Sequence, residues 1–351
     1  MGSTSYRSDI IFSDNLLQDL TPVISEYREG KIFMATETRV DSLWLQEDAF
    51  FRGIPKVVIP PGEENKKISS VETIWKFLSD SGADRKSLLI NVGGGMLTDL
   101  AGFAATTFKR GVDFVNIPTT LLSQVDASVG GKTGINFNGL KNEIGAFREP
   151  KAVIIHTPFL QTLDKYNLLS GFAEMIKHGL IYNPGHLQEL MDFNPERIDL
   201  TEFREYIRHS VEVKKYFVTN DPLEKNIRKA LNFGHTIGHA LESLAILRER
   251  PVLHGYAVAW GMISELYLSA QACRFPLPET DRISRWISRL YGKPNLASAD
   301  LDPLFELMHH DKKNEGGRII FTLLSGIGQY EINRTCSRDQ ISESLKYLRN
   351  L

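Results

Sequence analysis

Three side chains that could bind a metal ion lie close together in the segment 232–242. His235, His239 and Glu242 are spaced i, i+4 and i+7, so on a helix they share one face. Glu174 and His254 add a second carboxylate and a third imidazole from elsewhere in the chain. Histidine and carboxylate ligands suit catalytic Zn²⁺, which takes about three protein ligands and keeps one position open. The spacing alone does not decide which histidines bind the ion.

Basic residues cluster around these predicted metal-binding residues, on the same helices or the helix before. Lys177 and Lys214 precede the histidine segment, and Arg228 is spaced i, i+4 and i+7 with Asn232 and His235. Arg228 would then share the face of a metal ligand, where its planar guanidinium suits two hydrogen bonds to a carboxylate or phosphate. A single lysine is more often simply solvated. A metal beside several fixed cations, however, indicates a polyanionic substrate.

A glycine-rich turn marks a candidate nucleotide site. The apolar run that ends at Val92 leads directly into Gly93-Gly94-Gly95 and then into a predicted helix near Leu97. Such a turn lets the backbone and the helix N-terminus approach a pyrophosphate, although a triple glycine can also be only a tight turn. The spacing is not GxGxxG. Asp99 is equally compatible with a surface acid that stabilises the helix dipole.

A second glycine segment, Gly130-Gly131-Lys132-Thr133, looks like the end of a P-loop but does not complete one. Asp126 stands where the pattern requires glycine, and its carboxylate would repel phosphate. The sequence therefore argues against an ATPase. Lys132, Lys141 and Asn142 could still form an anion pocket, and ordinary solvated lysines are the alternative.

In the first half of the chain, strands that alternate with helices should position these residues. Short Val- and Ile-rich runs predict five strands, and helical periodicity such as that of Ile68 to Asp80 separates them, which indicates crossovers and a parallel sheet. The predicted strands are Lys31 to Thr36, Lys56 to Pro60, Ser87 to Val92, Asp113 to Pro118 and Ala152 to Thr157.

The second half is predicted to be mainly helical. Its long helical segments are Glu202 to Val218, Ile227 to Leu247 and Gly255 to Cys273, and one strand-like run, Arg318 to Leu324, interrupts them. We therefore predict an α/β fold with a Rossmann-like, NAD-binding domain at 1–157. A helical metal- and substrate-binding domain should cover 158–351.

Composition excludes several classes of protein. The 351 residues are 42 % hydrophobic and 24 % charged, which is typical of a globular protein of two domains. Lys plus Arg (41) nearly balances Asp plus Glu (43), so no global positive field predicts binding of nucleic acid or of an anionic membrane. Two cysteines and a polar N-terminus without a signal-peptide pattern favour the cytoplasm.

Taken together, several motifs resemble the 3-dehydroquinate synthase family over nearly the whole chain. Their order and spacing carry the resemblance, since each motif alone is weak. The motifs are Pro61-Gly62-Glu63 with Lys66; Gly93-Gly94-Gly95 with Asp99 and Gly102-Phe103; Lys109-Arg110-Gly111; Pro118 to Leu122; Asp126 to Thr133; Lys141-Asn142; Ala173-Glu174 with Lys177; Leu231 to Ala240; His254-Gly255; and Asp311-Lys312-Lys313.

The resemblance implies an NAD⁺- and Zn²⁺-dependent homodimeric cyclase, in which Co²⁺ could replace Zn²⁺. The implied reaction converts 3-deoxy-D-arabino-heptulosonate 7-phosphate to 3-dehydroquinate and phosphate, in the shikimate pathway of aromatic amino acid biosynthesis. Oxidation of a ring hydroxyl by NAD⁺ would acidify a neighbouring C–H, phosphate would leave, and NADH would return the hydride before ring opening and aldol closure.

The resemblance also implies a role for each matching position. Glu174, His235 and His254 would bind the metal, and His239 would contact phosphate or transfer a proton. Lys214 and Arg228 would bind the substrate carboxylate, while Asp126 and Lys177 would contact ring hydroxyls. NAD would be surrounded by Glu63, Lys66, Gly93, Gly94, Gly95, Asp99, Thr119, Thr120, Lys132, Lys141 and Thr162. Phosphate would be held by Lys132, Asn142, Asn232, His239, Lys312 and Arg110 of the partner subunit.

Three alternatives remain at this stage. A different sugar phosphate cyclase would act on a substrate without a carboxylate, which leaves Lys214 and Arg228 without an obvious anion. A metal-dependent polyol dehydrogenase needs no phosphate pocket, which leaves Lys132, Asn142 and Lys312 unexplained. A non-catalytic metal or nucleotide sensor would keep the ligands without turnover.

Overall fold

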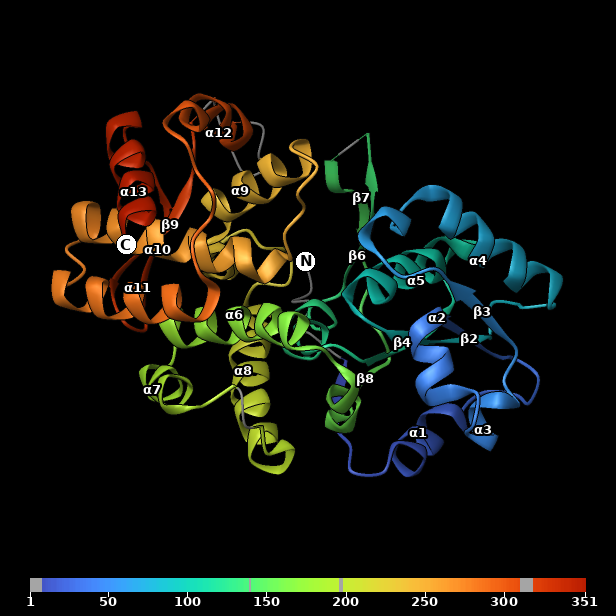
Figure 1. Cartoon of the computed structure of the whole chain (residues 1–351). Coiled ribbons are helices and arrows are strands. Elements are labelled where there is room, and N and C mark those ends of the chain that lie inside the picture. Colours follow the sequence, from blue (N-terminus) through green and yellow to red (C-terminus); the bar gives the residue numbers. More distant parts are fainter. Residues whose placement is uncertain (1–7, 139, 196–197, 310–317) are drawn as a thin grey trace. The chain divides into compact units, whose positions relative to one another are not determined.

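The computed structural model describes residues 8–138, 140–195, 198–309 and 318–351 (Figure 1). The chain divides into two compact units, Met1–Leu163 and Asp164–Leu351. Lys312, a predicted phosphate contact, lies outside the described residues.

A six-stranded parallel sheet forms the centre of the first unit, in the order β1-β8-β5-β4-β2-β3. All five predicted strands are present, because their Val- and Ile-rich runs are buried between two layers of helices. A sixth strand, β1, was not predicted. The strands are β1 (Asp9–Phe12), β2 (Ile32–Glu37), β3 (Lys56–Ile59), β4 (Leu88–Gly93), β5 (Asp113–Pro118) and β8 (Ala152–Ile155).

Helices cover both faces of this sheet. One face packs against α4 (Ile68–Asp80) and α5 (Gly95–Thr107). The other face packs against α1 (Leu16–Ile24), α3 (Ala49–Arg52) and the π-helical turn η1 (Asp41–Leu45). Short helical turns complete the connections: α2 (Thr38–Val40), η2 (Glu63–Asn65), η3 (Phe108–Arg110), η4 (Ser123–Ala127) and η5 (Thr157–Thr162).

The turn η5 places the end of the first unit at Leu163 rather than at the predicted residue 157. Phe159 belongs to the core on the face of the sheet that packs against α1 and α3. Its ring packs edge-on against that of Trp44, with ring centroids 5.0 Å apart. The Trp44 indole N–H also donates a hydrogen bond of 3.0 Å to the Thr162 hydroxyl. These contacts attach the segment after β8 to the first unit.

An antiparallel hairpin, β6 (Lys132–Phe137) and β7 (Leu140–Phe147), projects from the helical layer and was not predicted. Gly134 and Gly145 face each other across the two strands. Several of its large apolar side chains, including Phe137 and Phe147, are exposed. The hairpin therefore lacks the alternation of buried and exposed residues by which a strand is recognised in a sequence.

The second unit packs around α10 (His254–Cys273), which contacts α6, α9, α11, α13 and β9 (Figure 1). Its apolar side chains are buried on every side of the helix, as expected for a central helix. The other elements of this unit are α6 (Lys165–Ile181), α7 (Pro184–Asp192), α8 (Leu200–Asn220), η6 (Ile227–Asn232), α9 (His235–Leu247), α11 (Leu277–Tyr291), η7 (Ser298–Asp300), α12 (Leu301–His309), β9 (Phe321–Gly326), β10 (Gln329–Arg334) and α13 (Arg338–Asn350).

The predicted continuous helix from Ile227 to Leu247 is wrong. Residues Ile227–Asn232 form a 3₁₀ helix, and Gly234 then takes a left-handed conformation (φ +79°) before α9 begins. Arg228 and Asn232 therefore do not share an α-helical face with His235. The strand predicted at Arg318 to Leu324 begins at Phe321 and pairs with β10, which was not predicted.

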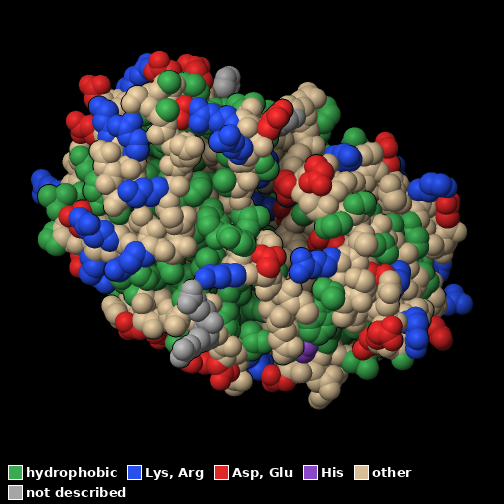
Figure 2. Space-filling view, in the orientation of Figure 1, with side chains coloured by type: hydrophobic (Ala, Val, Ile, Leu, Met, Phe, Trp, Pro, Cys, Tyr) green, Lys and Arg blue, Asp and Glu red, His purple; other side chains and the backbone are tan. Residues whose placement is uncertain are grey.

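The lengths of the helices and the mixed surface charges agree with the near balance of acidic and basic residues and the globular composition. No helix within the described ranges is long and apolar enough to cross a membrane. Figure 2 shows Lys and Arg side chains interspersed with Asp and Glu over the visible surface.

Candidate functional site

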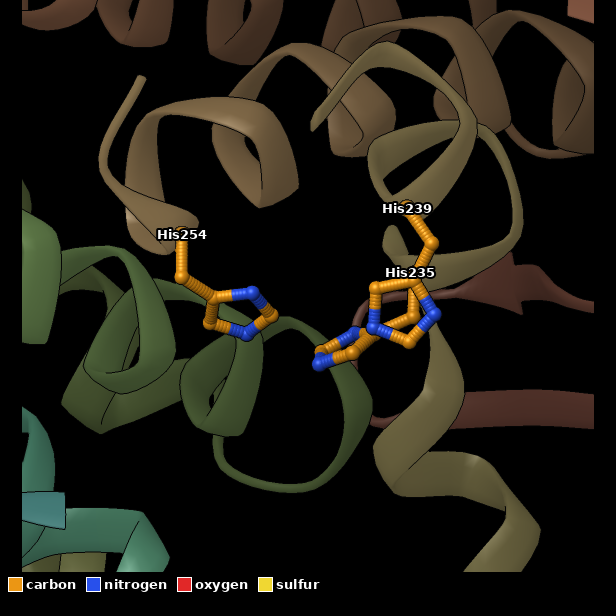
Figure 3. A group of neighbouring side chains, drawn as sticks. All are labelled: His235, His239 and His254. Carbon is orange, nitrogen blue, oxygen red and sulfur yellow. The ribbon is translucent and has the colours of Figure 1, made fainter. Parts of the chain in front are cut away.

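Three histidines converge in the second unit (Figure 3). His235 and His239 lie one turn apart on α9, and His254 is the first residue of α10. One ring nitrogen from each lies within 4.8 Å of the others. The structure thus brings together the three imidazoles among which the sequence did not decide.

Glu174 of α6 completes a set of metal-binding groups. Its Oε1 lies 3.4 Å from His235 Nε2 and 3.5 Å from His254 Nε2. Two ligands of one tetrahedral Zn²⁺ are about 3.3 Å apart, because each lies about 2.0–2.1 Å from the ion. Both carboxylate oxygens are buried, and neither accepts a hydrogen bond of good geometry from the described residues. Glu174, His235 and His254 therefore fit a divalent ion.

The charges around this cluster are strongly coupled. Burial alone would raise the pKa of Glu174, but Lys177, which forms an ion pair with it, and His235 hold that pKa well below its usual value. Burial would likewise lower the pKa of His254, whereas Glu242 and Glu174 raise it to about 9. The carboxylate is thus ionised, as a metal ligand must be.

The second nitrogen of each ring has a partner that orients it. His235 Nδ1 lies 3.1 Å from the Phe233 carbonyl oxygen, and His254 Nδ1 lies 3.3 Å from Glu242 Oε2. Metal-binding histidines usually donate their other N–H to such acceptors. Glu242, predicted to share a metal-binding face with His235 and His239, instead supports His254 from the side away from Glu174.

Glycines let the three helices approach closely enough to assemble the site. A Cβ on Gly255 would collide with the backbone of Ser170, one turn before Glu174 on α6. A Cβ on Gly261 of α10 would collide with the Gly234 carbonyl oxygen at the start of α9. Only residues without a side chain permit these contacts, which set the distances between Glu174, His235 and His254.

Glu265 is a structural residue that the sequence analysis missed. It lies on α10, is fully buried, and its carboxylate accepts hydrogen bonds from the backbone N–H groups of Gly234 (2.6 Å) and Ile237 (3.1 Å). The carboxylate therefore caps the N-terminus of α9 and fixes the turn that carries His235. No local signal reveals this role, because the cap comes from a distant helix.

The other predicted site residues of the second unit are buried or form hydrogen bonds within that unit. Lys177, Lys214 and Arg228 are all buried. The Arg228 guanidinium donates a 2.6 Å hydrogen bond to the Pro222 carbonyl oxygen, and the Asn232 amide donates one of 2.7 Å to Glu224. Buried cations of this kind are suited to bind anionic groups of a ligand.

The glycine turn of the first unit joins β4 to α5, as predicted. Gly93 ends the strand, Gly94 is the N-cap of α5, and Gly95 begins the helix. Thr119 follows β5 and donates its backbone N–H to the Gly93 carbonyl oxygen (3.0 Å), and Thr120 lies next to Gly94. The carboxyl ends of β4 and β5 thus bring these residues to one edge of the sheet.

Glu37 was missed by the sequence analysis. It ends β2, the strand beside β4, and its carboxylate accepts a 2.8 Å hydrogen bond from the Gly94 backbone N–H. Burial raises the pKa of this carboxyl, and the bond from Gly94 partly opposes the shift. An acidic residue at the end of the neighbouring strand is the available sequence signal, since such residues often bind a nucleotide ribose.

A buried lysine links several of the predicted NAD and phosphate contacts. Lys66 Nζ lies 2.7 Å from Asp99 and 2.6 Å from the Asn142 side-chain oxygen. Burial alone would lower the pKa of Lys66, but Asp99 and Glu63 raise it. Asn136, another missed residue, donates a 2.9 Å hydrogen bond to Glu63. Asp99 is therefore part of this network rather than an isolated surface acid.

The remaining predicted residues of the first unit lie around these elements. Lys132 begins β6, Lys141 lies on β7, and Asp126 lies on η4. Arg110 is exposed and has a left-handed backbone (φ +71°), and Thr162 ends η5.

Comparisons with known proteins show what the sequence of this chain is similar to. Residues 56–170 match the family model described as 3-dehydroquinate synthase N-terminal, and residues 171–314 match the model described as 3-dehydroquinate synthase C-terminal. The 3-dehydroquinate synthase of Parabacteroides distasonis is 48 % identical over 343 residues, which cover 97 % of each chain.

Two solved structures share the fold. A 2-deoxy-scyllo-inosose synthase complexed with carbaglucose-6-phosphate, NAD⁺ and Co²⁺ has a TM-score of 0.84 at 22 % identity, over 98 % of both chains. A 2-epi-5-epi-valiolone synthase from Streptomyces hygroscopicus, with NAD⁺ and Zn²⁺ bound, has a TM-score of 0.83 at 24 % identity and covers 100 % of this chain and 98 % of its own. With the family models matching most of its length, the chain belongs to the 3-dehydroquinate synthase family.

Proposed function

We propose that this chain is a phosphorus–oxygen lyase that converts 3-deoxy-D-arabino-heptulosonate 7-phosphate to 3-dehydroquinate and phosphate. The reaction would use NAD⁺ and Zn²⁺, with Co²⁺ as a substitute. One observation carries the proposal: the ionised Glu174 carboxylate lies 3.4 and 3.5 Å from the Nε2 atoms of His235 and His254. The family membership of the chain supports this reaction.

Glu174, His235 and His254 would hold the ion. When bound, Zn²⁺ supplies a Lewis acid that stabilises a ring oxygen as hydride leaves for the nicotinamide. The Phe233 carbonyl and the Glu242 carboxylate keep the two imidazoles in the orientation that presents Nε2. Lys177 keeps Glu174 ionised and would contact a ring hydroxyl of the substrate.

Lys214 and Arg228 would bind the substrate carboxylate. Both side chains are buried, and a carboxylate is the group that separates this substrate from those of related cyclases. Arg228 is fixed by its bond to the Pro222 carbonyl, so its guanidinium is already oriented. This pair favours the heptulosonate over a sugar phosphate without a carboxylate.

NAD would bind at the glycine turn of the first unit. The Gly94 N–H lies at the start of α5, where a helix N-terminus favours a phosphate group. Glu37, which already accepts from that N–H, is suited to the ribose hydroxyls. The other proposed contacts are Glu63, Lys66, Gly93, Gly95, Asp99, Thr119, Thr120, Lys132, Lys141 and Thr162.

The substrate phosphate would be held by groups from several elements. The proposed contacts from this chain are Lys132, Asn142, Asn232, His239 and Lys312. We further propose a cytoplasmic homodimer in which Arg110 of the partner subunit reaches the phosphate. Asp126 would contact a ring hydroxyl.

A phosphate-release assay with the purified protein, NAD⁺ and Zn²⁺ tests the proposal. We expect turnover of the heptulosonate phosphate, no accumulation of NADH, and loss of activity with a chelator. Turnover of sedoheptulose 7-phosphate instead would indicate another cyclase, and steady NADH production would indicate a dehydrogenase.

A matched pair of variants tests the carboxylate contact. Replacing a buried charged partner costs about 2 kcal/mol or more, so Lys214→Met should lower kcat/KM at least about 30-fold. Lys215→Met changes the neighbouring exposed lysine of α8 and should leave kcat/KM unchanged. Equal effects of the two substitutions would remove Lys214 from the substrate site.

A further inference from the structure

A second group of two histidines and one glutamate lies on α7 and α8 and shares no residue with the proposed catalytic set. His186 and Glu189 are one turn apart on α7, and His209 lies on α8. Each side chain offers one ligand atom, and these three atoms lie within 4.8 Å of one another. The proposed reaction gives none of them a role.

His186 presents an oriented nitrogen to this cluster. Its side chain is buried, and its Nε2 lies 2.9 Å from the hydroxyl oxygen of Ser210, which is also buried. Its Nδ1 forms no hydrogen bond with the described residues, although it is buried and lies 3.5 Å from Glu189 Oε2. With Nε2–H donating to Ser210, the Nδ1 lone pair points at the cluster, which is the arrangement of a metal-binding histidine.

The spacing of the ligand atoms fits one ion. Glu189 Oε2 lies 3.1 Å from His209 Nδ1 and 3.5 Å from His186 Nδ1. Both values are close to the distance of about 3.3 Å that separates two ligands of a tetrahedral Zn²⁺. Similar separations, 3.4 and 3.5 Å, occur around Glu174 in the candidate catalytic cluster.

Acidic residues of both helices give the surroundings of the cluster negative charge. Burial and the carboxylates of Glu202, Glu189 and Asp192 raise the pKa of the Tyr206 hydroxyl on α8. A concentration of carboxylates of this kind favours a bound cation.

We propose that His186, Glu189 and His209 bind a second divalent ion of the Zn²⁺ class that joins α7 to α8. Two imidazoles and one carboxylate form a three-ligand set, and the partial exposure of Glu189 and His209 leaves room for water as the fourth ligand. Because α7 ends at Asp192 and α8 begins at Leu200, an ion shared by both would stabilise the unit through their packing. The ion would be structural and separate from catalysis.

Metal counting tests this second site. Full-length protein is freed of metal with a chelator and dialysed against micromolar Zn²⁺, and the bound zinc is measured per chain. We expect two zinc ions for the wild type and one for Glu189→Gln and for His209→Ala, which alter partly exposed side chains and should fold. Glu205→Gln, which changes an exposed acid elsewhere on α8, should keep two.

Thermal unfolding and activity separate this site from the proposed catalytic one. Zinc should raise the Tm of Glu189→Gln by less than that of the wild type, while phosphate release stays unchanged. His254→Gln should lose the other ion and keep the α7–α8 ion. Equal zinc content in the wild type, Glu189→Gln and His209→Ala would overturn the proposal, whatever the activity.

Discussion

At the scale of single residues, the candidate metal centre depends on groups behind the ligands. Glu242 accepts from His254 Nδ1 at 3.3 Å, and the Phe233 carbonyl oxygen lies 3.1 Å from His235 Nδ1. With an ion bound, each acceptor would hold the N–H at Nδ1 and leave the Nε2 lone pair for the metal. Glu242 would therefore contribute to metal affinity without touching the ion.

Replacing this acceptor should weaken metal binding. Glu242→Gln removes the negative charge and the preference for N–H at His254 Nδ1, so we expect the Zn²⁺ affinity to fall about 10- to 100-fold. Competition with a chromophoric chelator measures that affinity. Glu249→Gln, just after α9, is the matched control and should bind Zn²⁺ like the wild type. An unchanged affinity in Glu242→Gln would mean that the contact is incidental.

The sequence predicted which residues belong to the candidate site, but not which groups they contact. Glu174, His235 and His254 were named from motif positions and lie together, and their roles as ligands stay a prediction. The roles of Glu265 and Glu37 could not be predicted, because each acts on a backbone N–H far away in the sequence. Which nitrogen of a histidine is available likewise depends on such non-local contacts.

At the scale of elements, the contact between α10 and α6 sets the position of His254 relative to Glu174. The Gly255 N–H donates a 3.0 Å hydrogen bond to the Ser170 hydroxyl, and the two backbones touch. Ser170 and Glu174 are one turn apart on α6, and His254 precedes Gly255. The ligand distance is thus a consequence of helix packing.

Adding one methyl group at this contact should disturb both stability and metal binding. Gly255→Ala would force α10 away from α6, and overpacking of this kind costs about 1–3 kcal/mol. We expect the Tm to fall by several degrees and the Zn²⁺ affinity to fall with it. Gly53→Ala places its Cβ in ordinary contact at 3.5 Å and should change neither. Normal zinc binding in Gly255→Ala would show that α10 tolerates the shift.

Elements with strong periodicity were predicted well, and elements shaped by tertiary contacts were not. The parallel strands and α4 follow local patterns of apolar residues. The break at Gly234 was hidden because the residues on either side continue a helical pattern, while Glu265 and the close packing of α10 stabilise the turn. The β6–β7 hairpin was missed because its strands expose apolar side chains.

At the scale of the whole molecule, the two kinds of proposed cofactor contact fall in different units. All residues proposed for NAD lie within Met1–Leu163, and all proposed metal ligands lie within Asp164–Leu351. Each set is built from its own core and its own hydrogen bonds. The general division into an α/β half and a helical half followed from the sequence, whereas the exact boundary required the packing of Phe159.

This separation predicts the effect of removing the metal. Chelation should abolish phosphate release while the NAD⁺ affinity, measured by fluorescence titration, changes less than about 3-fold, because each binding free energy comes from independent groups. Adding Zn²⁺ back should restore activity. Loss of NAD⁺ binding in the metal-free protein would contradict this independence.

If Glu174, His235 and His254 bind the ion as proposed, the close backbone contacts at Gly255 and Gly261 would also limit which ions the protein can accept. Ca²⁺ prefers about six to eight oxygen ligands at about 2.3–2.6 Å, more and longer bonds than two imidazoles and one carboxylate at this spacing can provide. Helices that already touch cannot close further around a smaller ion, and the fixed carboxylate and imidazoles cannot spread around a larger one. The site would therefore exclude the abundant hard cations of the cell because Gly255 and Gly261, which have no side chains, let the helices pack closely and fix the ligands.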